Sequence, residues 1–340
     1  MSEALFYEKL SNHQVKCRLC HQFCQISLGR RGFCGVRENQ NGVLQTLVYG
    51  KVIAANVDQI EKKPLYHFLP GSYSFSMATV GCNFSCANCQ NADISQAAKV
   101  QDKKRQLALP GSDLSSQDVV DQALKLNCQS ISYTYTEPTV FFEFALDCMK
   151  LAKEKGLKNV WVSNGYTAQP ALEMAKPYLD AVNVDLKFFE DKIYQKICGA
   201  KLQPVLDNLV WYKQNKIWLE VTTLVIPTLN DDTIQLTKIA KFIKEKLGIE
   251  TPWHVSAFFP TYKLNRLSPT LAADIKKAWQ IGKDIGLRNV YSGNISYPHM
   301  ENTYCPNCSE LVIERQGYKI KRFDKANHCQ KCGYKLDLIS

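Results

Sequence analysis

No stretch of the sequence stays apolar over the roughly 18 residues that a membrane-spanning helix needs, so we expect no membrane partner. The opening segment, MSEALFYEKL, contains acidic side chains and lacks an apolar signal core, which argues against secretion. The formal net charge is +10, but no long basic run interleaved with aromatic residues accompanies it. We therefore interpret the charge as that of a solvated surface rather than a nucleic-acid site. Together these absences predict a cytoplasmic protein.

Cysteine, in contrast, is abundant, with 14 residues in a chain of 340. Three of them, Cys128, Cys148 and Cys198, stand alone. The others form three clusters: Cys17, Cys20, Cys24 and Cys34; then Cys82, Cys86 and Cys89; then Cys305, Cys308, Cys329 and Cys332. In a reducing cytoplasm, clustered thiols bind metals more often than they form disulfides. We therefore expect metal sites at the clusters.

Short apolar segments alternate with helical ones between about residues 73 and 294. The predicted strands lie in residues 72–80, 130–138, 159–165, 181–189, 218–227, 252–260 and 288–294. Two of the helices between them have clear ends, one capped by Ser115 or Ser116 and one closed by Gly248. The alternation predicts an α/β fold with a parallel sheet, arranged as a complete or partial (β/α) barrel. A doubly wound open sheet is the alternative.

The chain is long for one compact core, and appendages to the barrel are expected. We predict a Cys-rich N-terminal metal-binding segment over residues 1–72, the barrel over 73–299, and a zinc-ribbon-like module over 300–340.

Polar residues gather where the predicted strands end, which in parallel βα folds is the active face. They are Glu137, Ser163, Asn164, Asp185, Lys187 and His254. Each of them can instead cap a helix or satisfy a loop, but a whole set on one face favours a functional site.

The central cysteines have the spacing C-x3-C-x2-C and follow the first predicted strand. Three thiolates leave one iron of a [4Fe–4S] cluster free for another ligand. The spacing resembles the signature of the radical S-adenosylmethionine (SAM) superfamily, in which the free iron chelates SAM. One electron then cleaves SAM to a 5′-deoxyadenosyl radical, which abstracts hydrogen from a substrate. A zinc site completed by a distant residue is the structural alternative.

The resemblance extends over nearly the whole chain. The sequence carries, in order, CRLCHQFCQISLGRRGFCGVRENQNG, KPLYHFLPG, GCNFSCANCQN, YTEPT, SNGY, VDLKFF and VYSGN. This series looks like that of the AmmeMemoRadiSam-system radical SAM proteins, relatives of the pyruvate formate-lyase activating enzymes. Partners implied by it are an external electron donor of the flavodoxin or ferredoxin type and, through the family name, Memo-like and AMMECR1-like proteins.

By the same resemblance, Cys82, Cys86 and Cys89 would hold the cluster, and Glu137 would meet the amino group of SAM. The ribose and carboxylate region would be lined by Ser163, Asn164, Asp185 and Lys187, with His254 nearby. Three positions depart from the family pattern: Asn88 and Ala92 where relatives often carry an aromatic residue, and Phe259 where they often carry a histidine. These departures affect adenine contacts and substrate choice rather than cluster chemistry.

The terminal cysteine clusters have different spacings. Cys305, Cys308, Cys329 and Cys332 form C-x2-C-x20-C-x2-C, which is typical of a zinc ribbon. Cys17, Cys20, Cys24 and Cys34 form C-x2-C-x3-C-x9-C, for which zinc and a second iron–sulfur cluster both stay open.

The leading hypothesis is therefore a radical SAM enzyme that uses a [4Fe–4S] cluster, SAM and zinc and acts on an unidentified substrate. That substrate is either a small molecule or a glycyl-radical protein. Two further hypotheses are an RNA-modifying radical SAM protein and a non-catalytic metal-binding scaffold.

Overall fold

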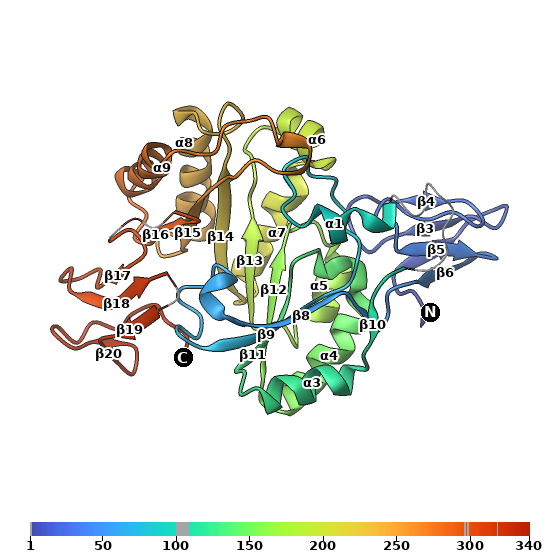
Figure 1. Cartoon of the computed structure of the whole chain (residues 1–340), viewed down its shortest axis with the longest axis horizontal. Helices are drawn as coiled ribbons and strands as arrows, with labels where there is room; N and C mark the ends of the chain where they lie inside the picture. The colour runs from blue at the N-terminus through green and yellow to red at the C-terminus, as the bar shows by residue number, and fades with distance from the viewer. Residues whose placement is uncertain (1, 100–108, 296, 298, 318) are drawn as a thin grey trace.

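One large sheet forms the centre of the computed structural model, which describes residues 2–99, 109–295, 297, 299–317 and 319–340 (Figure 1). Within those ranges it has eight strands, in the order β16-β15-β14-β13-β12-β11-β9-β8. They are β8 (Ala54–Gln59), β9 (Tyr73–Ala78), β11 (Ser130–Tyr133), β12 (Lys158–Ser163), β13 (Ala181–Asp185), β14 (Trp218–Val225), β15 (Trp253–Ala257) and β16 (Val290–Gly293). Neighbours from β9 to β16 pair parallel, and β8 pairs antiparallel with β9.

All seven predicted strands are present, as β9 and β11 to β16. Their spatial order follows their order in the sequence, whereas a doubly wound sheet reverses its strand order. In the described part of the chain the edge strands β16 and β8 do not pair with each other, so the barrel is partial. The predicted α/β fold is confirmed, and the doubly wound alternative is wrong.

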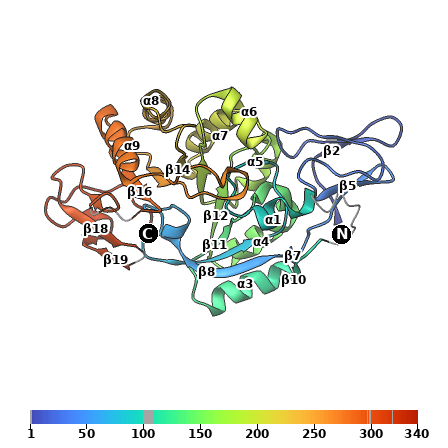
Figure 2. The ribbon, with the colours of Figure 1, turned by 45° about the horizontal axis from the view of Figure 1, so that its top comes forward.

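Helices cover the outside of the sheet (Figure 2). They are α3 (Ser116–Lys125), α4 (Phe142–Glu154), α5 (Gln169–Ala175), α7 (Gln203–Gln214), α8 (Thr233–Phe242) and α9 (Ala272–Ile285), while α1 (Ala92–Ser95) and α6 (Asp191–Cys198) lie near the carboxyl ends of the strands. The predicted cap of α3 is Ser115, whose hydroxyl accepts from Asp118 N at 3.1 Å while the Asp118 carboxylate accepts from Ser115 N at 2.8 Å. Gly248, with φ +101°, ends the helical segment that continues α8.

The two faces of the sheet differ in polarity. Phe75, Met77 and Tyr133 belong to the core shared with the helices. Because side chains alternate along a strand, Ser74 and Ser132 point to the inner face, where their hydroxyls lie 2.6 Å apart. A buried polar inner face suits a barrel that encloses a site for polar ligands.

The N-terminal region forms two small antiparallel sheets. One contains β1 (Ser2–Glu3), β6 (Val43–Thr46) and β5 (Arg37–Gln40), and the other contains β2 (Tyr7–Lys9), β3 (Val15–Cys17) and β4 (Gln25–Ile26). A separate pair joins β7 (Lys51–Val52) to β10 (Ser112–Asp113). The division of the chain at residues 72 and 299 stays a proposal, and we note that β8, which precedes residue 72, belongs to the main sheet.

The C-terminal module has its own small core beneath short strands, namely β17 (Thr303–Tyr304), β18 (Leu311–Gln316), β19 (Lys319–Arg322), β20 (Asp324–Lys325) and β21 (His328–Cys329). Backbone hydrogen bonds join it to the segment before β9: Leu69 N donates to Ile339 O at 2.7 Å, and Ile339 N donates to His67 O at 2.8 Å. The buried Arg315 guanidinium lies 4.3 Å from the Tyr66 ring centroid and donates to Tyr66 O at 2.7 Å. The module is therefore packed against the barrel rather than tethered to it.

Across the ranges that the structure describes, no helix combines the length and apolar character needed to cross a membrane.

Candidate active site

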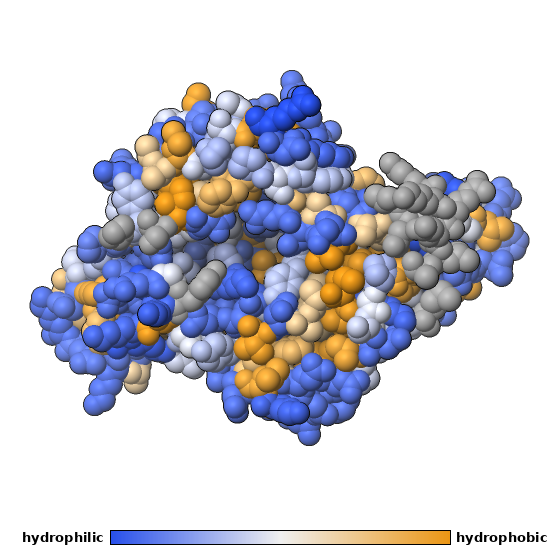
Figure 3. Space-filling model, in the orientation of Figure 1, coloured by the Kyte–Doolittle hydropathy of each residue, from blue (hydrophilic) through white to orange (hydrophobic). Residues whose placement is uncertain are grey.

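A cavity of about 450 Å³ opens at the carboxyl ends of the parallel strands. Figure 3 shows one face of the molecule, and hydrophilic residues surround the centre of this face. Hydrophobic residues gather over β8, where Val57 is half-exposed. The cavity is lined by all but one of the residues that the sequence assigns to the cluster and SAM sites: Cys82, Cys86, Cys89, Glu137, Ser163, Asn164, Asp185 and Lys187. The structure thus brings together side chains from four strand ends.

The three-cysteine loop is held by backbone contacts to a distant helix end. Ser85 N donates to Cys198 O at 2.8 Å, and Ala87 N donates to Ile197 O at 2.9 Å, both at the end of α6. Gly81, with φ +100°, begins the loop, and a Cβ there would lie 2.6 Å from a Val36 methyl group. Only glycine fits at that turn. The loop geometry therefore depends on both α6 and the N-terminal region.

Glu137 is buried and bonded by four donors. Its Oε1 accepts from Thr139 N at 3.2 Å, Thr139 Oγ1 at 2.6 Å and Ser163 Oγ at 2.9 Å. Its Oε2 accepts from Asn164 N at 2.8 Å. Burial raises the pKa of the Glu137 carboxyl, and these donors oppose part of that rise. Ser163 and Asn164 therefore position Glu137, which also caps the short helix η2 (Pro138–Phe141).

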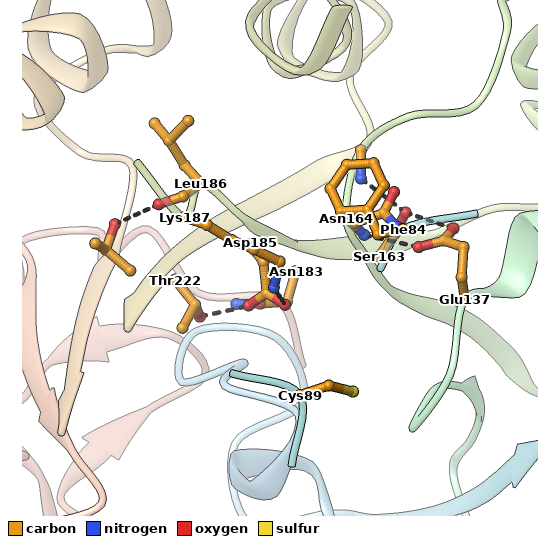
Figure 4. A network of polar contacts seen from close by, with 12 residues as sticks. Phe84, Cys89, Glu137, Ser163, Asn164, Asn183, Asp185, Leu186, Lys187 and Thr222 are labelled. Atoms are coloured by element: carbon orange, nitrogen blue, oxygen red, sulfur yellow. Dashed lines mark hydrogen bonds and ion pairs between the residues drawn. The ribbon is translucent and has the colours of Figure 1, made fainter. Parts of the chain in front are cut away.

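Asp185 and Lys187 form an ion pair of 2.8 Å at the end of β13. Burial lowers the pKa of Lys187, but the Asp185 carboxylate and the neighbouring Cys86 raise it further, so that it lies well above its ordinary value. Lys187 is therefore cationic at neutral pH. Figure 4 shows this pair on one side of the site and Glu137 with Ser163 and Asn164 on the other.

His254 is not brought to this cavity. It is the second residue of β15, well before the carboxyl end of the strand, and its Nε2 lies 2.7 Å from Glu220 Oε2. The same carboxylate accepts from Tyr66 N at 2.9 Å and His67 N at 2.8 Å. His254 thus anchors the segment that contacts the C-terminal module, and we leave it out of the proposed SAM site.

The structure adds two residues, Cys198 and Asn83, that no sequence pattern points to. The Cys198 thiol is hydrogen-bonded to that of Cys86, which raises the pKa of Cys86 well above its ordinary value. Asn83 accepts at Oδ1 from Asn164 Nδ2 at 2.7 Å and so ties the cysteine loop to the end of β12. No spacing pattern signals either contact, because each partner is far away in the chain.

The positions that depart from the family pattern are placed as follows. Asn88 is buried and lines the cavity, and its Oδ1 has no hydrogen-bond partner among the described residues. Ala92 begins α1, and Phe259 is 48% exposed.

The two terminal cysteine clusters differ in geometry. In the described ranges, only the C-terminal four place their sulfur atoms within 4.8 Å of one another, as a group able to hold a metal ion. Cys17, Cys20, Cys24 and Cys34 instead surround a second, smaller cavity.

Comparisons with known proteins show to which family this part of the chain is similar. A family model described as the Radical SAM superfamily matches residues 77–238, which include the cysteine loop and β11 to β14. An uncharacterized protein of Methanocaldococcus jannaschii is 43% identical, with 100% of both chains covered. The pyruvate formate-lyase-activating enzyme of Clostridium pasteurianum is 25% identical over 54% of this chain and 77% of that enzyme.

A likeness of fold is also found among solved structures. Streptococcus suis SuiB bound to precursor peptide SuiA matches with a TM-score of 0.51 and 14% identity, over 71% of this chain and 52% of SuiB. The family match, the two relatives and the shared fold lead to one conclusion: the chain belongs to the Radical SAM superfamily, and its radical SAM domain is homologous to pyruvate formate-lyase-activating enzymes.

Proposed function

We propose that the protein is a radical SAM enzyme in which Cys82, Cys86 and Cys89 hold a [4Fe–4S] cluster with one open iron. The observation that carries this proposal is that the three thiols line the same cavity as the charged side chains that follow β11 and β13. When bound there, the cluster and SAM supply a 5′-deoxyadenosyl radical that takes hydrogen from a substrate.

The residues present fit this cofactor pair. Thiolates are the ligands that iron–sulfur clusters prefer, and three of them line one wall of the cavity. In the described part of the chain these thiols do not form the compact group that a single metal ion requires. A larger inorganic core held by three thiolates therefore fits better than a lone zinc ion.

The charged side chains match the two ends of the SAM amino-acid group. Oε2 of the Glu137 carboxylate accepts a hydrogen bond from Asn164 N. It can accept a further hydrogen bond from the ammonium group of SAM. The Lys187 ammonium can pair with the SAM carboxylate, and Asp185 can accept from ribose hydroxyls. The free Oδ1 of Asn88 is suited to accept from the adenine amino group, in the place where relatives carry an aromatic ring.

We propose a glycyl-radical protein as the first substrate class to test, because the radical SAM domain is homologous to pyruvate formate-lyase-activating enzymes. A small molecule is the second. The proposed electron donor is of the flavodoxin or ferredoxin type, and Memo-like and AMMECR1-like proteins are the proposed partners. At the other end of the chain, we propose zinc for the C-terminal thiols, where Cys305 and Cys332 lie 3.6 Å apart and Cys308 and Cys329 lie 3.7 Å apart. A tetrahedral zinc–thiolate site gives separations of about 3.8 Å.

The experiment that tests this function is a SAM cleavage assay. Protein reconstituted with iron and sulfide under anaerobic conditions should release 5′-deoxyadenosine when SAM and a one-electron reductant are added. No 5′-deoxyadenosine should be released without the reductant. A true substrate should raise its release above the level measured without any substrate. If protein with a full complement of iron released none under reduction, the proposed function would be wrong.

Substituting Glu137 should affect both stability and SAM binding. Whichever way the amide of Glu137→Gln is turned, its NH2 group faces one of two backbone donors, Thr139 N or Asn164 N. A buried donor left unpaired costs about 1–3 kcal/mol, so the melting temperature should fall. Loss of the charge should also weaken SAM binding by about one to two decades.

The matched control for this variant is Thr139→Val, which removes one hydroxyl donor to the same carboxylate but keeps its charge, at a residue that does not line the SAM cavity. We expect the control to lower the melting temperature with much less effect on SAM affinity. Normal SAM affinity in Glu137→Gln, together with a lowered melting point, would restrict Glu137 to its structural role.

A further inference from the structure

The four N-terminal cysteines surround a single cavity next to the proposed active site. Cys17, Cys20, Cys24 and Cys34 all line it, although they come from the end of β3 and from the loops that follow β3 and β4. The centre of a water molecule has about 20 Å³ in which to move inside this cavity, and its wall is largely apolar. The convergence of four thiols on one largely apolar space indicates a bound inorganic group rather than a set of packed side chains.

The spacing of these thiols disfavours a single zinc ion. Four thiolates around zinc lie about 3.8 Å from one another, because each Zn–S bond is about 2.3 Å long. The C-terminal cysteines have this arrangement, with separations of 3.6 and 3.7 Å. All four N-terminal cysteines lie in the described residues, yet no three of their sulfur atoms lie within 4.8 Å of one another. Two cysteine quartets in one chain thus differ in the size of the group that they can hold.

A larger core fits the N-terminal quartet. In a [4Fe–4S] cluster, iron and sulfide stand between the cysteine sulfurs, so the four thiolates are spread farther apart than around one ion. We propose that Cys17, Cys20, Cys24 and Cys34 bind a second iron–sulfur cluster, of the [4Fe–4S] type.

A buried cation beside the cavity supports a negatively charged occupant. Arg37 is 1% exposed and lines the cavity. Its terminal nitrogens donate to Leu5 O and to the Glu143 carboxylate, but its Nε has no hydrogen-bond partner in the described part of the chain. Four thiolates around an oxidised cluster carry a net negative charge, which a neighbouring guanidinium stabilises in a low-dielectric site.

The position of the second cluster suggests its role, and this part of the inference rests on the proposed function. Asn83 and Thr139 line the N-terminal cavity. Asn83 directly follows Cys82, and Thr139 donates to Glu137 at 2.6 Å. One layer of residues therefore separates the two cavities. Phe33 lines the N-terminal cavity and is 40% exposed, so this cavity lies close to the protein surface, where an external electron donor can approach it.

In this role the second cluster acts as an electron relay. An external one-electron donor of the ferredoxin or flavodoxin class is oxidised by one electron, and the N-terminal cluster is reduced by one. That cluster then returns to its oxidised state as the same electron passes to the cluster at Cys82, Cys86 and Cys89. No bond is formed or broken in the relay.

The test compares metal content and Mössbauer spectra of anaerobically reconstituted full-length protein. The wild type should hold about eight irons per chain, and the double variant Cys17→Ser, Cys34→Ser should hold about four. The matched variant Cys82→Ala, Cys86→Ala, Cys89→Ala should also hold about four, but these should be insensitive to SAM. Cys128→Ala, at a lone buried cysteine, should keep all eight and so controls for thiol loss.

Two outcomes would overturn the proposal, one measured on the wild type and one on a variant that leaves the N-terminal cysteines intact. Wild-type protein with about four irons and two zinc ions per chain would place zinc in the N-terminal quartet. Iron that vanishes entirely from the Cys82, Cys86 and Cys89 variant would show that only one cluster exists. If protein with eight irons per chain failed to cleave SAM, the proposed function would be wrong, but the proposal of a second cluster would still hold.

Discussion

Replacing Cys82, Cys86 and Cys89 together with alanine should abolish 5′-deoxyadenosine release and remove about four irons per chain. The expected effect is complete because these thiols are the proposed ligands of the active-site cluster, and each iron site depends on its thiolate. Zinc content should not change, since the C-terminal cysteines lie in a separate module with its own core. Product analysis and metal analysis on the same preparation measure both quantities.

A matched control for this variant is Cys148→Ala. Cys148 is fully buried in α4, away from the cavity, so its replacement tests the loss of a thiol without loss of a proposed ligand. We expect the control to keep the iron content and the activity of the wild type. The triple variant should have about four fewer irons per chain and no activity. Undiminished iron together with SAM cleavage in the triple variant would place the active cluster elsewhere.

Removing the proposed zinc from the C-terminal module should have the largest effect on stability. The module contains few buried hydrophobic residues, and structural zinc in small domains contributes roughly 10–16 kcal/mol of binding free energy. The double variant Cys305→Ala, Cys329→Ala should therefore lose its zinc and unfold the module. Cys305 and Cys329 are both buried, so alanine there also weakens the small core.

The effect should extend into the barrel. The module supplies Arg315, which stacks on Tyr66, and Ile339, which bonds to the backbone of residues 67–69. Unfolding the module would expose these partners, so the melting temperature of the barrel should fall as well. Zinc analysis, thermal unfolding and limited proteolysis near residue 300 measure the three effects. Retained zinc, or a melting temperature equal to that of Cys128→Ala, would contradict this account.

Much of the fold could be predicted from the sequence because its signals are local. The parallel strands are short segments rich in β-branched and aromatic residues, and every one of the seven appears in the sheet. The cysteine spacing and the acidic and basic residues after strands are local too, and they converge because parallel strands end on one face.

Other features depend on contacts between distant segments, which a local pattern cannot contain. His254 lies in a predicted strand, as Ser163 and Asp185 do, yet it lies early in β15, away from the carboxyl end of the strand, and is paired with Glu220. Cys198 stands alone in the sequence but lies beside Cys86, which is far from it in the chain. β8 lies in the predicted N-terminal segment, but its hydrogen bonds to β9 make it an edge strand of the barrel sheet.

The electron paramagnetic resonance spectrum of the reduced protein, with and without SAM, shows whether three thiolates leave one iron of the active-site cluster open to SAM. We predict a [4Fe–4S]+ signal that changes shape when SAM is added, and no such change in the Cys82, Cys86 and Cys89 variant. A signal of full intensity that SAM leaves unaltered in the wild type would show that the cluster has no iron available to SAM, and the proposed open site would be wrong.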